Sequence, residues 1–433
     1  MKKIIALALF SALTSHFLTA QTPTPAAAQS EPILILNATL HVGDGQVITE
    51  ASIGFDNGKI TLIGKDISAK YDRSRYKKVI DAKGKHVYPS LIAPNTPLGL
   101  VEVQSVRATV DLVEIGDYNP SVRSLVAYNT DSHILPTIRS NGVLLAQVVP
   151  QGGRISGSSS IMELDGWNWE DAAHSIDDGM HLRFPAIFSS GFDPVNGFSQ
   201  RKNENFVKDI TDTETFFREA KAYNEKTAPT PKNLKFEAMR GIFTGKKTLF
   251  IHANAAKEIT EGVALGKKFG CKTVIVGGRE SWMLTDVLLS NNVAVILEET
   301  QALPNRNDDD IDQPFKTPAM LKKAGVEFCM SVAGYWQQRN LPLMAGQAVG
   351  FGLDKEAAIA AMTSSTAKIL GIDKTVGTLE TGKDATLIIS EGDILDMRTS
   401  IVTQAFIKGK AVDLDTKQKQ LYRRYKTKYE RGN

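Results

Sequence analysis

The sequence predicts an α/β protein in which a (β/α)8 TIM-like barrel carries a composite β-sandwich domain built from both chain termini. Two observations predict this architecture. Residues 88–375 alternate apolar strand runs with amphipathic helical stretches, which is typical of a parallel sheet covered by helices. Residues 31–87 and 376–413 read as short strands separated by turn signals. Neither flank holds enough apolar residues for a core of its own, so the two are expected to fold together.

The first residues of the chain are expected to direct export. Lys2 and Lys3 precede a mostly apolar run that ends at a small-residue boundary, Ala20. This pattern is typical of a secretory signal peptide over residues 1–20, followed by a flexible lead-in over 21–30. We therefore expect a periplasmic or secreted protein. The run is shorter than the roughly 20 residues of a spanning helix, and no transmembrane segment is expected after cleavage.

The two flanks share a β-rich texture. Residues 33–64 contain short apolar runs and an Asn57-Gly58 pair, which is a strong signal for a tight hairpin. Residues 376–413 contain similar runs, such as 385–389, bounded by glycine and lysine. This texture predicts two β-rich flanks that enclose the barrel region and combine into one composite domain.

The middle region contains buried runs rich in β-branched residues, which predict barrel strands. These runs are 142–149, 248–252, 273–276, 294–297 and 326–330. Amphipathic stretches at 256–269 and 280–290 predict helices between them. This alternation implies parallel strands, and the length favours a closed barrel over an open doubly wound sheet. No Gly-x-Gly-x-x-Gly motif follows the first strand, which argues against nucleotide binding.

Positive charge is concentrated near the end of the sequence. The net charge is +3, and residues 417–433 carry seven Lys or Arg against one Glu, so the rest of the chain is slightly negative. This distribution gives no basic face for nucleic acid. The basic C-terminal tail, 414–433, also carries Tyr422, Tyr425 and Tyr429. It is expected to form a solvated helix or to contact an anionic surface or partner.

Two stretches flank the barrel region with recognisable motifs. The entry reads Ile-Thr-Leu-Ile-Gly at 60–64 and Val-Ile-Asp-Ala-Lys-Gly-Lys-His-Val-Tyr-Pro-Ser-Leu-Ile at 79–92. The exit combines Ala-Lys-Ile-Leu-Gly-Ile at 367–372 with Gly-Thr-Leu-Glu-Thr-Gly-Lys-Asp-Ala at 377–385. Together they resemble the imidazolonepropionase-like group of the amidohydrolase superfamily, over nearly the whole mature chain. The resemblance implies a metal-centred barrel that carries a β-sandwich made from both termini.

The same resemblance implies five metal-binding groups in the barrel, of which the sequence matches one, His252 on the fifth strand. Asn95 and Pro97 stand where relatives carry His-x-His, and Gly277 and Val332 replace a histidine and an aspartate. Catalytic zinc normally takes three protein ligands. No metal and no other cofactor is therefore expected, although zinc or another divalent metal would be required if the protein is a hydrolase.

A rebuilt metal site would require ligands far apart in the sequence. Six histidines follow the predicted signal peptide, and no two are spaced i,i+2 or i,i+4. The histidines are His41, His86, His133, His174, His181 and His252. Carboxylates near strand ends are conceivable oxygen ligands, namely Glu102, Asp117, Glu298 and Glu299. The catalytic residue is unknown. His252 is the candidate, with a satisfied polar residue at the barrel mouth as the alternative.

Other residues are candidates for ligand binding. A Gly/Ser loop follows the 142–149 strand, and its backbone N–H groups, with an arginine, could bind an anion. An ordinary flexible loop is the alternative. The ligand-binding candidates are Asn95, Gly152, Gly153, Arg154, Ser156, Asn254 and Tyr335.

Two functions remain open from the sequence, and whether the protein is an enzyme is uncertain. The first is a pseudoenzyme with a degenerate metal site that binds a small molecule or pairs with an active relative. The second is a divergent hydrolase of C–N bonds in a non-peptide or cyclic amide. The small molecule is unidentified under either reading, and the protein could form a homo-oligomer. Function is carried by the site and not by the fold, so the resemblance alone does not decide between them.

Overall fold

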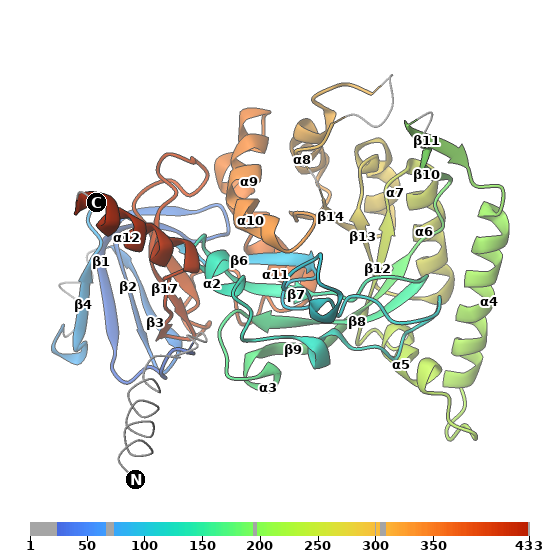
Figure 1. Cartoon of the computed structure of the whole chain (residues 1–433), viewed down its shortest axis with the longest axis horizontal. Coiled ribbons are helices and arrows are strands. Elements are labelled where there is room, and N and C mark those ends of the chain that lie inside the picture. Colours follow the sequence, from blue (N-terminus) through green and yellow to red (C-terminus); the bar gives the residue numbers. More distant parts are fainter. Residues whose placement is uncertain (1–23, 66–72, 194–196, 299, 304–308, 432–433) are drawn as a thin grey trace, which may run out of the picture.

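The computed structural model describes most of the chain. The described residues are 24–65, 73–193, 197–298, 300–303 and 309–431. The predicted signal peptide, residues 1–20, lies outside the described residues, as does Glu299. A mixed sheet lies at one end of the molecule, and the barrel occupies the rest (Figure 1).

Both ends of the sequence contribute to the mixed sheet, in the order β18-β17-β16-β5-β1-β2-β3, with β4 pairing β1. Its strands are β1 (Ile33–His41), β2 (Val47–Asp56), β3 (Lys59–Lys65), β4 (Lys78–Asp81), β5 (His86–Pro89), β16 (Leu387–Ser390), β17 (Val402–Ile407) and β18 (Lys410–Ala411). β5 pairs in parallel with β1 and antiparallel with β16, so it joins the two flanks. The predicted hairpin joins β2 to β3, with φ of +49° at Asn57 and +76° at Gly58.

One apolar core serves both flanks. Phe55 on β2 contacts Phe406 on β17 edge to face, with 5.0 Å between ring centroids. Both rings are fully buried, among Ile53, Leu387 and Ile389. Each flank therefore supplies roughly one wall of a core that neither could close alone, which confirms the predicted composite architecture.

The barrel sheet runs in the order β6-β7-β8-β9-β12-β13-β14-β15. Its strands are β6 (Leu91–Thr96), β7 (Val143–Val148), β8 (Ile155–Glu163), β9 (Ala173–Arg183), β12 (Thr248–Ala253), β13 (Thr273–Gly277), β14 (Ala294–Leu297) and β15 (Phe328–Met330). The predicted fold class is confirmed, but the expectation of parallel strands throughout was wrong. β8 runs antiparallel to both of its neighbours.

Connection length explains the reversed strand. Only residues 149–154 separate β7 from β8, and residues 164–172 separate β8 from β9. A parallel crossover needs about a dozen residues or more, so connections this short impose antiparallel pairing. A further hairpin, β10 (Phe188–Asp193) with β11 (Gly197–Lys202), projects from the barrel.

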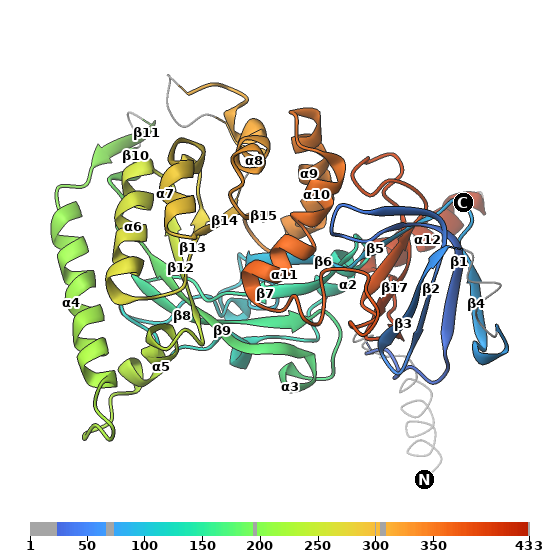
Figure 2. The same ribbon diagram turned by 180° about the vertical axis from the view of Figure 1, so that it is seen from behind.

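Helices follow most of the other strands and cover the outside of the barrel (Figures 1 and 2). They are α2 (Leu135–Arg139), α3 (Trp169–Ala172), α4 (Phe206–Asn224), α5 (Leu234–Phe243), α6 (Ala256–Phe269), α7 (Thr285–Ser290), α8 (Gln313–Ala324), α9 (Leu341–Gly350), α10 (Lys355–Ala360) and α11 (Ser364–Leu370). A last helix, α12 (Lys417–Glu430), lies beside the mixed sheet instead. None of the described helices is long and apolar enough to cross a membrane.

α6 illustrates how local sequence sets an element. The Glu258 side chain accepts hydrogen bonds from the N–H groups of Asn254 and Ala255, both at 3.2 Å, and so satisfies donors before the first turn. The helix ends at Gly270, whose φ of +73° is a left-handed cap. The predicted bounds, 256–269, match the observed helix.

The barrel is not fully closed by strand pairing. Among the described residues, β15 and β6 do not pair with each other. Side-chain hydroxyls bridge this seam instead: Ser331 Oγ donates to Pro94 O at 2.5 Å, and Thr96 Oγ1 donates to Gly334 O at 3.1 Å. The segment after α10 also joins the two edges, because Met330 N donates to Ala361 O at 3.0 Å and Ile92 N donates to Met362 O at 2.9 Å. The seam is thus held by a few hydrogen bonds and not by a continuous strand ladder.

We expect Phe406→Ala to destabilise both flanks together. Removing a fully buried ring costs about 3–5 kcal/mol of unfolding free energy. Hydrogen exchange should therefore accelerate in β1 and β2, which are far away in the sequence, as well as in β17. Phe188→Ala, at an exposed position, is the matched control and should leave the exchange of β1 unchanged. Protection of β1 that survives Phe406→Ala would contradict the shared core.

Candidate functional site

A cavity opens where the carboxyl ends of the barrel strands meet. Its volume is about 230 Å³. It is lined by Asn95, Thr96, Pro97, Val149, Pro150, Gln151, Ser156, Arg183, His252, Glu298, Ala333 and Gly334. This is the end of a TIM barrel at which active sites are built, because loops from several strands converge there. We call these residues the mouth.

The structure brings five of the predicted candidates into the mouth. Asn95 and Pro97 come from the end of β6, Ser156 from the start of β8, and His252 from β12, and Glu298 directly follows β14. The other candidates do not line it. Tyr335 packs partly buried against the barrel core.

The predicted anion loop is used to hold a neighbouring segment. Ile155 N donates to Asp117 O at 2.9 Å, and Arg154 N donates to the same carbonyl at 2.6 Å. A side chain at Gly153 would collide with that carbonyl, and one at Gly152 would collide with Val113. The Arg154 guanidinium donates to Arg183 O at 3.1 Å. These groups therefore fix the loop to the barrel and lie outside the mouth.

His252 forms a hydrogen bond with a second histidine inside the barrel. Its Nε2 lies 3.0 Å from Nδ1 of His181, which is fully buried on β9 and stacks on Phe250. Burial, and then the nearby positive charge of Arg183, lower the pKa of His252 to about 3. Burial also lowers the pKa of His181 well below its ordinary value. Both rings are therefore neutral at physiological pH.

His181 has a second ring nitrogen in the barrel interior. Its Nε2 is buried and has no hydrogen-bond partner within the described part of the chain. A buried polar atom without a hydrogen-bond partner lowers the stability of the folded state, so this nitrogen carries a free-energy cost. The other ring nitrogen, Nδ1, forms the hydrogen bond with His252.

Asn95 occupies a strained position on the first strand. Its φ is +50°, a left-handed value that asparagine tolerates better than most residues. Its side-chain amide donates to Glu298 Oε1 at 2.5 Å, and its backbone N–H donates to Gln147 Oε1 at 3.2 Å. The amide at the first strand is thus engaged by a carboxylate across the mouth.

A polar chain continues from Asn95 below the mouth. Gln147 Nε2 donates to Asp178 Oδ2 at 2.7 Å, and Ser159 Oγ donates to Asp178 Oδ1 at 2.9 Å. Burial outweighs these two hydrogen bonds and raises the pKa of Asp178 to about 6. The chain couples β6, β7, β8 and β9 beneath the cavity.

Gly277 cannot be replaced by a larger residue without rearrangement. Its φ is +96°, and a Cβ there would lie 2.6 Å from Asn254 Oδ1. A side chain at this sixth-strand position would both strain the backbone and displace Asn254. Val332, at the eighth-strand position, is buried and presents only methyl groups.

Arg183 supplies a positive charge at the mouth. It follows Leu182 at the end of β9 and is exposed. Within the described residues its guanidinium forms no ion pair, whereas the neighbouring Arg154 lies 3.5 Å from Asp209. An arginine without an acidic partner is available for a planar anion such as a carboxylate.

The fold and part of the sequence match known proteins. The structure resembles an amidohydrolase from Thermotoga maritima MSB8, with a TM-score of 0.75 at 21% identity, covering 88% of this chain and 99% of that one. Residues 311–412 match the amidohydrolase family. The family match covers the last barrel strand and part of the mixed sheet, and the structural likeness shows the amidohydrolase fold over most of the chain.

Two further proteins share parts of this likeness. Over 82 residues the chain is 35% identical to a 5-methylthioadenosine/S-adenosylhomocysteine deaminase from Thermococcus sibiricus, a match that spans 19% of the chain and 18% of the deaminase. An adenosine deaminase from Xanthomonas campestris with bound zinc has a TM-score of 0.53 at 14% identity, covering 94% of this chain and 99% of that one. The second likeness shows the amidohydrolase fold alone.

Sequence reasoning missed two residues of the site, His181 and Arg183. Both lie on β9, which was not among the predicted strands. The alternation His181-Leu182-Arg183 at the end of this segment was the available signal, because alternate residues on a strand share one face. Glu298 was considered only as a metal ligand, and its bond to Asn95 depends on the tertiary fold.

We expect the buried His181 to make stability fall in acid. Above about pH 6.5 both states carry a neutral imidazole, but below it only the unfolded state takes up the proton. Unfolding is therefore favoured as pH falls. Between about pH 7 and pH 5, urea unfolding should show the unmodified protein losing roughly 2 kcal/mol more than His181→Phe. His133→Phe, at an exposed site, should keep the original pH dependence. Equal losses in all three proteins would contradict the neutral buried ring.

Proposed function

We propose that the protein binds a small, carboxylate-bearing molecule in the mouth, and that it does not hydrolyse amides through a metal-bound hydroxide. The observation that carries this proposal is the His181–His252 hydrogen bond at 3.0 Å. It engages Nε2 of the one histidine that matches the expected metal ligands. Within the superfamily, the entry and exit motifs support placement in the imidazolonepropionase-like group.

The residues at the positions where relatives carry metal ligands do not fit a catalytic divalent metal. Pro97, Gly277 and Val332 offer no side-chain donor atoms, and the Asn95 amide already donates to Glu298. Catalytic zinc needs about three protein ligands in addition to water. The closed packing at Gly277 supports the same conclusion, because a histidine there would have no space.

His252 is also poorly suited to general-base catalysis. An efficient base has a pKa near the working pH, so that it is both deprotonated and basic enough to accept a proton. Burial and Arg183 instead lower the pKa of His252 to about 3. A neutral imidazole of this kind is suited to hydrogen bonding with an uncharged part of a ligand.

The size of the mouth and the Arg183 charge support a small ligand with one carboxylate, because the other charged group of the mouth, Glu298, already accepts a hydrogen bond from the Asn95 amide. A cavity of about 230 Å³ is smaller than the roughly 300–1,000 Å³ of drug-sized pockets. The Arg183 guanidinium can bind a carboxylate through two hydrogen bonds. Ser156 and His252 add uncharged polar groups at the same cavity.

We expect no stoichiometric zinc, manganese or iron in the purified protein. The measurement is elemental analysis after purification without chelators and with added zinc, with His252→Ala analysed alongside. Near-zero metal is expected in both proteins, because one imidazole does not hold a divalent ion. About one metal per chain that is lost in His252→Ala would support the divergent C–N hydrolase instead.

We expect Arg183→Gln to weaken carboxylate binding selectively. N-acetylglycine is the probe and N-acetylglycinamide is its uncharged counterpart, with affinities measured by NMR titration. Loss of a charged hydrogen bond should weaken the carboxylate about tenfold or more, with little change for the amide. Arg218→Gln, which alters an exposed arginine on α4, is the matched control. Equal binding of both probes by the unmodified protein would contradict an arginine-bound carboxylate.

A further inference from the structure

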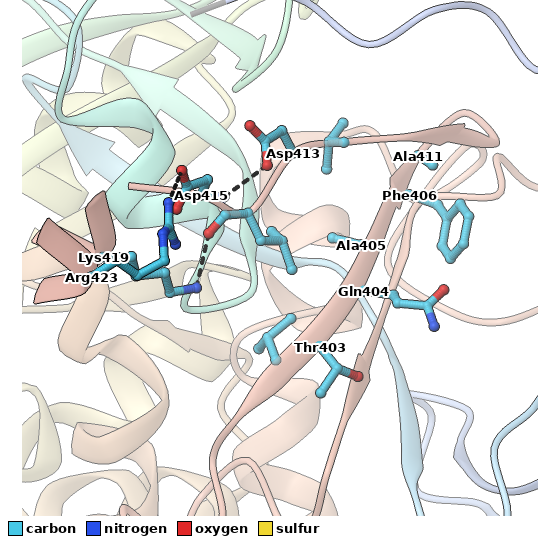
Figure 3. A pocket seen from close by; sticks show the side chains of 12 residues that line it. Thr403, Gln404, Ala405, Phe406, Ala411, Asp413, Asp415, Lys419 and Arg423 are labelled. Atoms are coloured by element: carbon cyan, nitrogen blue, oxygen red, sulfur yellow. Dashed lines mark hydrogen bonds and ion pairs between the residues drawn. The ribbon is translucent and has the colours of Figure 1, made fainter. Parts of the chain in front are cut away.

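α12 lies at the end of the molecule opposite α4, beside the mixed sheet (Figures 1 and 2). Thr416 caps it by accepting a hydrogen bond from Lys419 N at 3.1 Å, and Arg423 pairs with Asp415 at 2.7 Å. Figure 3 shows these two cations reaching a groove beside β17. None of the helix's residues is buried. The helix is therefore attached through polar contacts at its first turns, and the rest of its surface is exposed.

One face of α12 carries a stripe of large, partly apolar side chains. Residues recur at helical spacings of three and four, which places them on one side of a helix with about 100° per residue. The exposed fractions are 40% for Leu421, 66% for Tyr422, 51% for Tyr425 and 74% for Tyr429. We call these four residues the tyrosine stripe. Gln418 lies on the same face in the first turn, and its Oε1 accepts a hydrogen bond from Thr137 Oγ1 at 3.1 Å. None of the four stripe side chains is itself buried in the described structure.

Cations border the tyrosine stripe on both sides. The same helical geometry places one row of cations along each long edge of the tyrosine stripe. The first row is Lys417, Arg424 and Lys428, and the second is Lys419, Arg423 and Lys426. The remaining face carries Gln420 and Thr427. This is the pattern of a helix that lies in a membrane interface, with aromatic groups inward and cations level with the headgroups.

We propose that α12 docks the protein onto a lipid bilayer rich in anionic lipid. Tyrosine suits this position because the ring is apolar and its hydroxyl stays hydrated at the headgroups. Each Lys or Arg near an anionic surface adds a favourable electrostatic contribution. The rest of the chain is slightly negative and is repelled by the same surface, so the charge distribution orients α12 toward the membrane.

The charge pattern disfavours a second copy of this chain as the occupant. Two stripes packed together would bring the bordering cation rows of both helices side by side, and like charges repel. Two of the cations are already partly neutralised, Arg423 by Asp415 and Lys426 by Glu430 at 3.6 Å. Arg424 forms no ion pair within the described residues, and Lys428 lies 5.7 Å from the Tyr429 ring centroid. The uncompensated cations therefore call for an external anion.

The test is co-sedimentation of the full chain with vesicles. We expect binding to mixed phosphatidylglycerol/phosphatidylcholine vesicles, weakened by salt, and none to pure phosphatidylcholine. Replacing Arg424 and Lys428 together by Gln should weaken binding roughly 25-fold, about fivefold for each cation. Replacing Tyr422, Tyr425 and Tyr429 together by Ser should weaken it about tenfold or more.

The control replaces Lys322 and Lys323, two exposed cations at the end of α8, by Gln. It makes the same charge change elsewhere and should leave vesicle binding unchanged. The thermal unfolding midpoint should be unaltered in all variants, because α12 has no buried side chain. Failure to bind phosphatidylglycerol vesicles, or equal loss in the α8 control, would overturn the proposal. Binding of a poly-glutamate peptide without any vesicle binding would assign α12 to an acidic protein instead.

Discussion

β5 pairs with β1 on one side and with β16 on the other, and the barrel enters directly from this strand. β5 ends at Pro89 and β6 begins at Leu91, with Ser90 N donating to Thr386 O at 3.1 Å between them. The first barrel strand therefore starts from a sheet that strands distant in sequence have already fixed. Because β6 carries Asn95, the geometry of the mouth depends on that joint.

The polar groups of the mouth and of the barrel beneath it are largely directed at one another. His252 meets His181, Asn95 meets Glu298, and Gln147 links Asn95 to the carboxyl of Asp178. Hydrogen bonds of this kind rigidify a site and specify one arrangement when each member is satisfied. Such a network favours recognition of one shape of ligand. Arg183, at the edge of the cavity, forms no ion pair within the described residues and supplies positive charge there.

Local patterns predicted the elements whose ends are encoded locally. α6 is amphipathic and ends at a glycine, and β14 is a short β-branched run, so both were predicted with the observed bounds. β8 and β9 were missed because their sequences are rich in Ser, Gly, His and Asp, which hide the apolar pattern of a strand. The partner of His252 could not be predicted, since it depends on the register between β9 and β12. The entry and exit motifs led to the fold that the structural comparison shows, because they encode the joint between sheet and barrel.

Because β15 and β6 do not pair in the described structure, the barrel sheet is open along one seam. A continuous backbone ladder resists opening over its whole length, but here the two edges are joined by hydroxyl groups, including Ser331 Oγ, and by the backbone of Ala361 and Met362. The cavity lies over this seam, because residues 95–97 after β6 and residues 333–334 after β15 both line it. Thermal breathing of the ring will concentrate at its weakest joint. The width of the cavity therefore depends on how far this seam opens. A ligand that contacts both edges of the seam would hold them together.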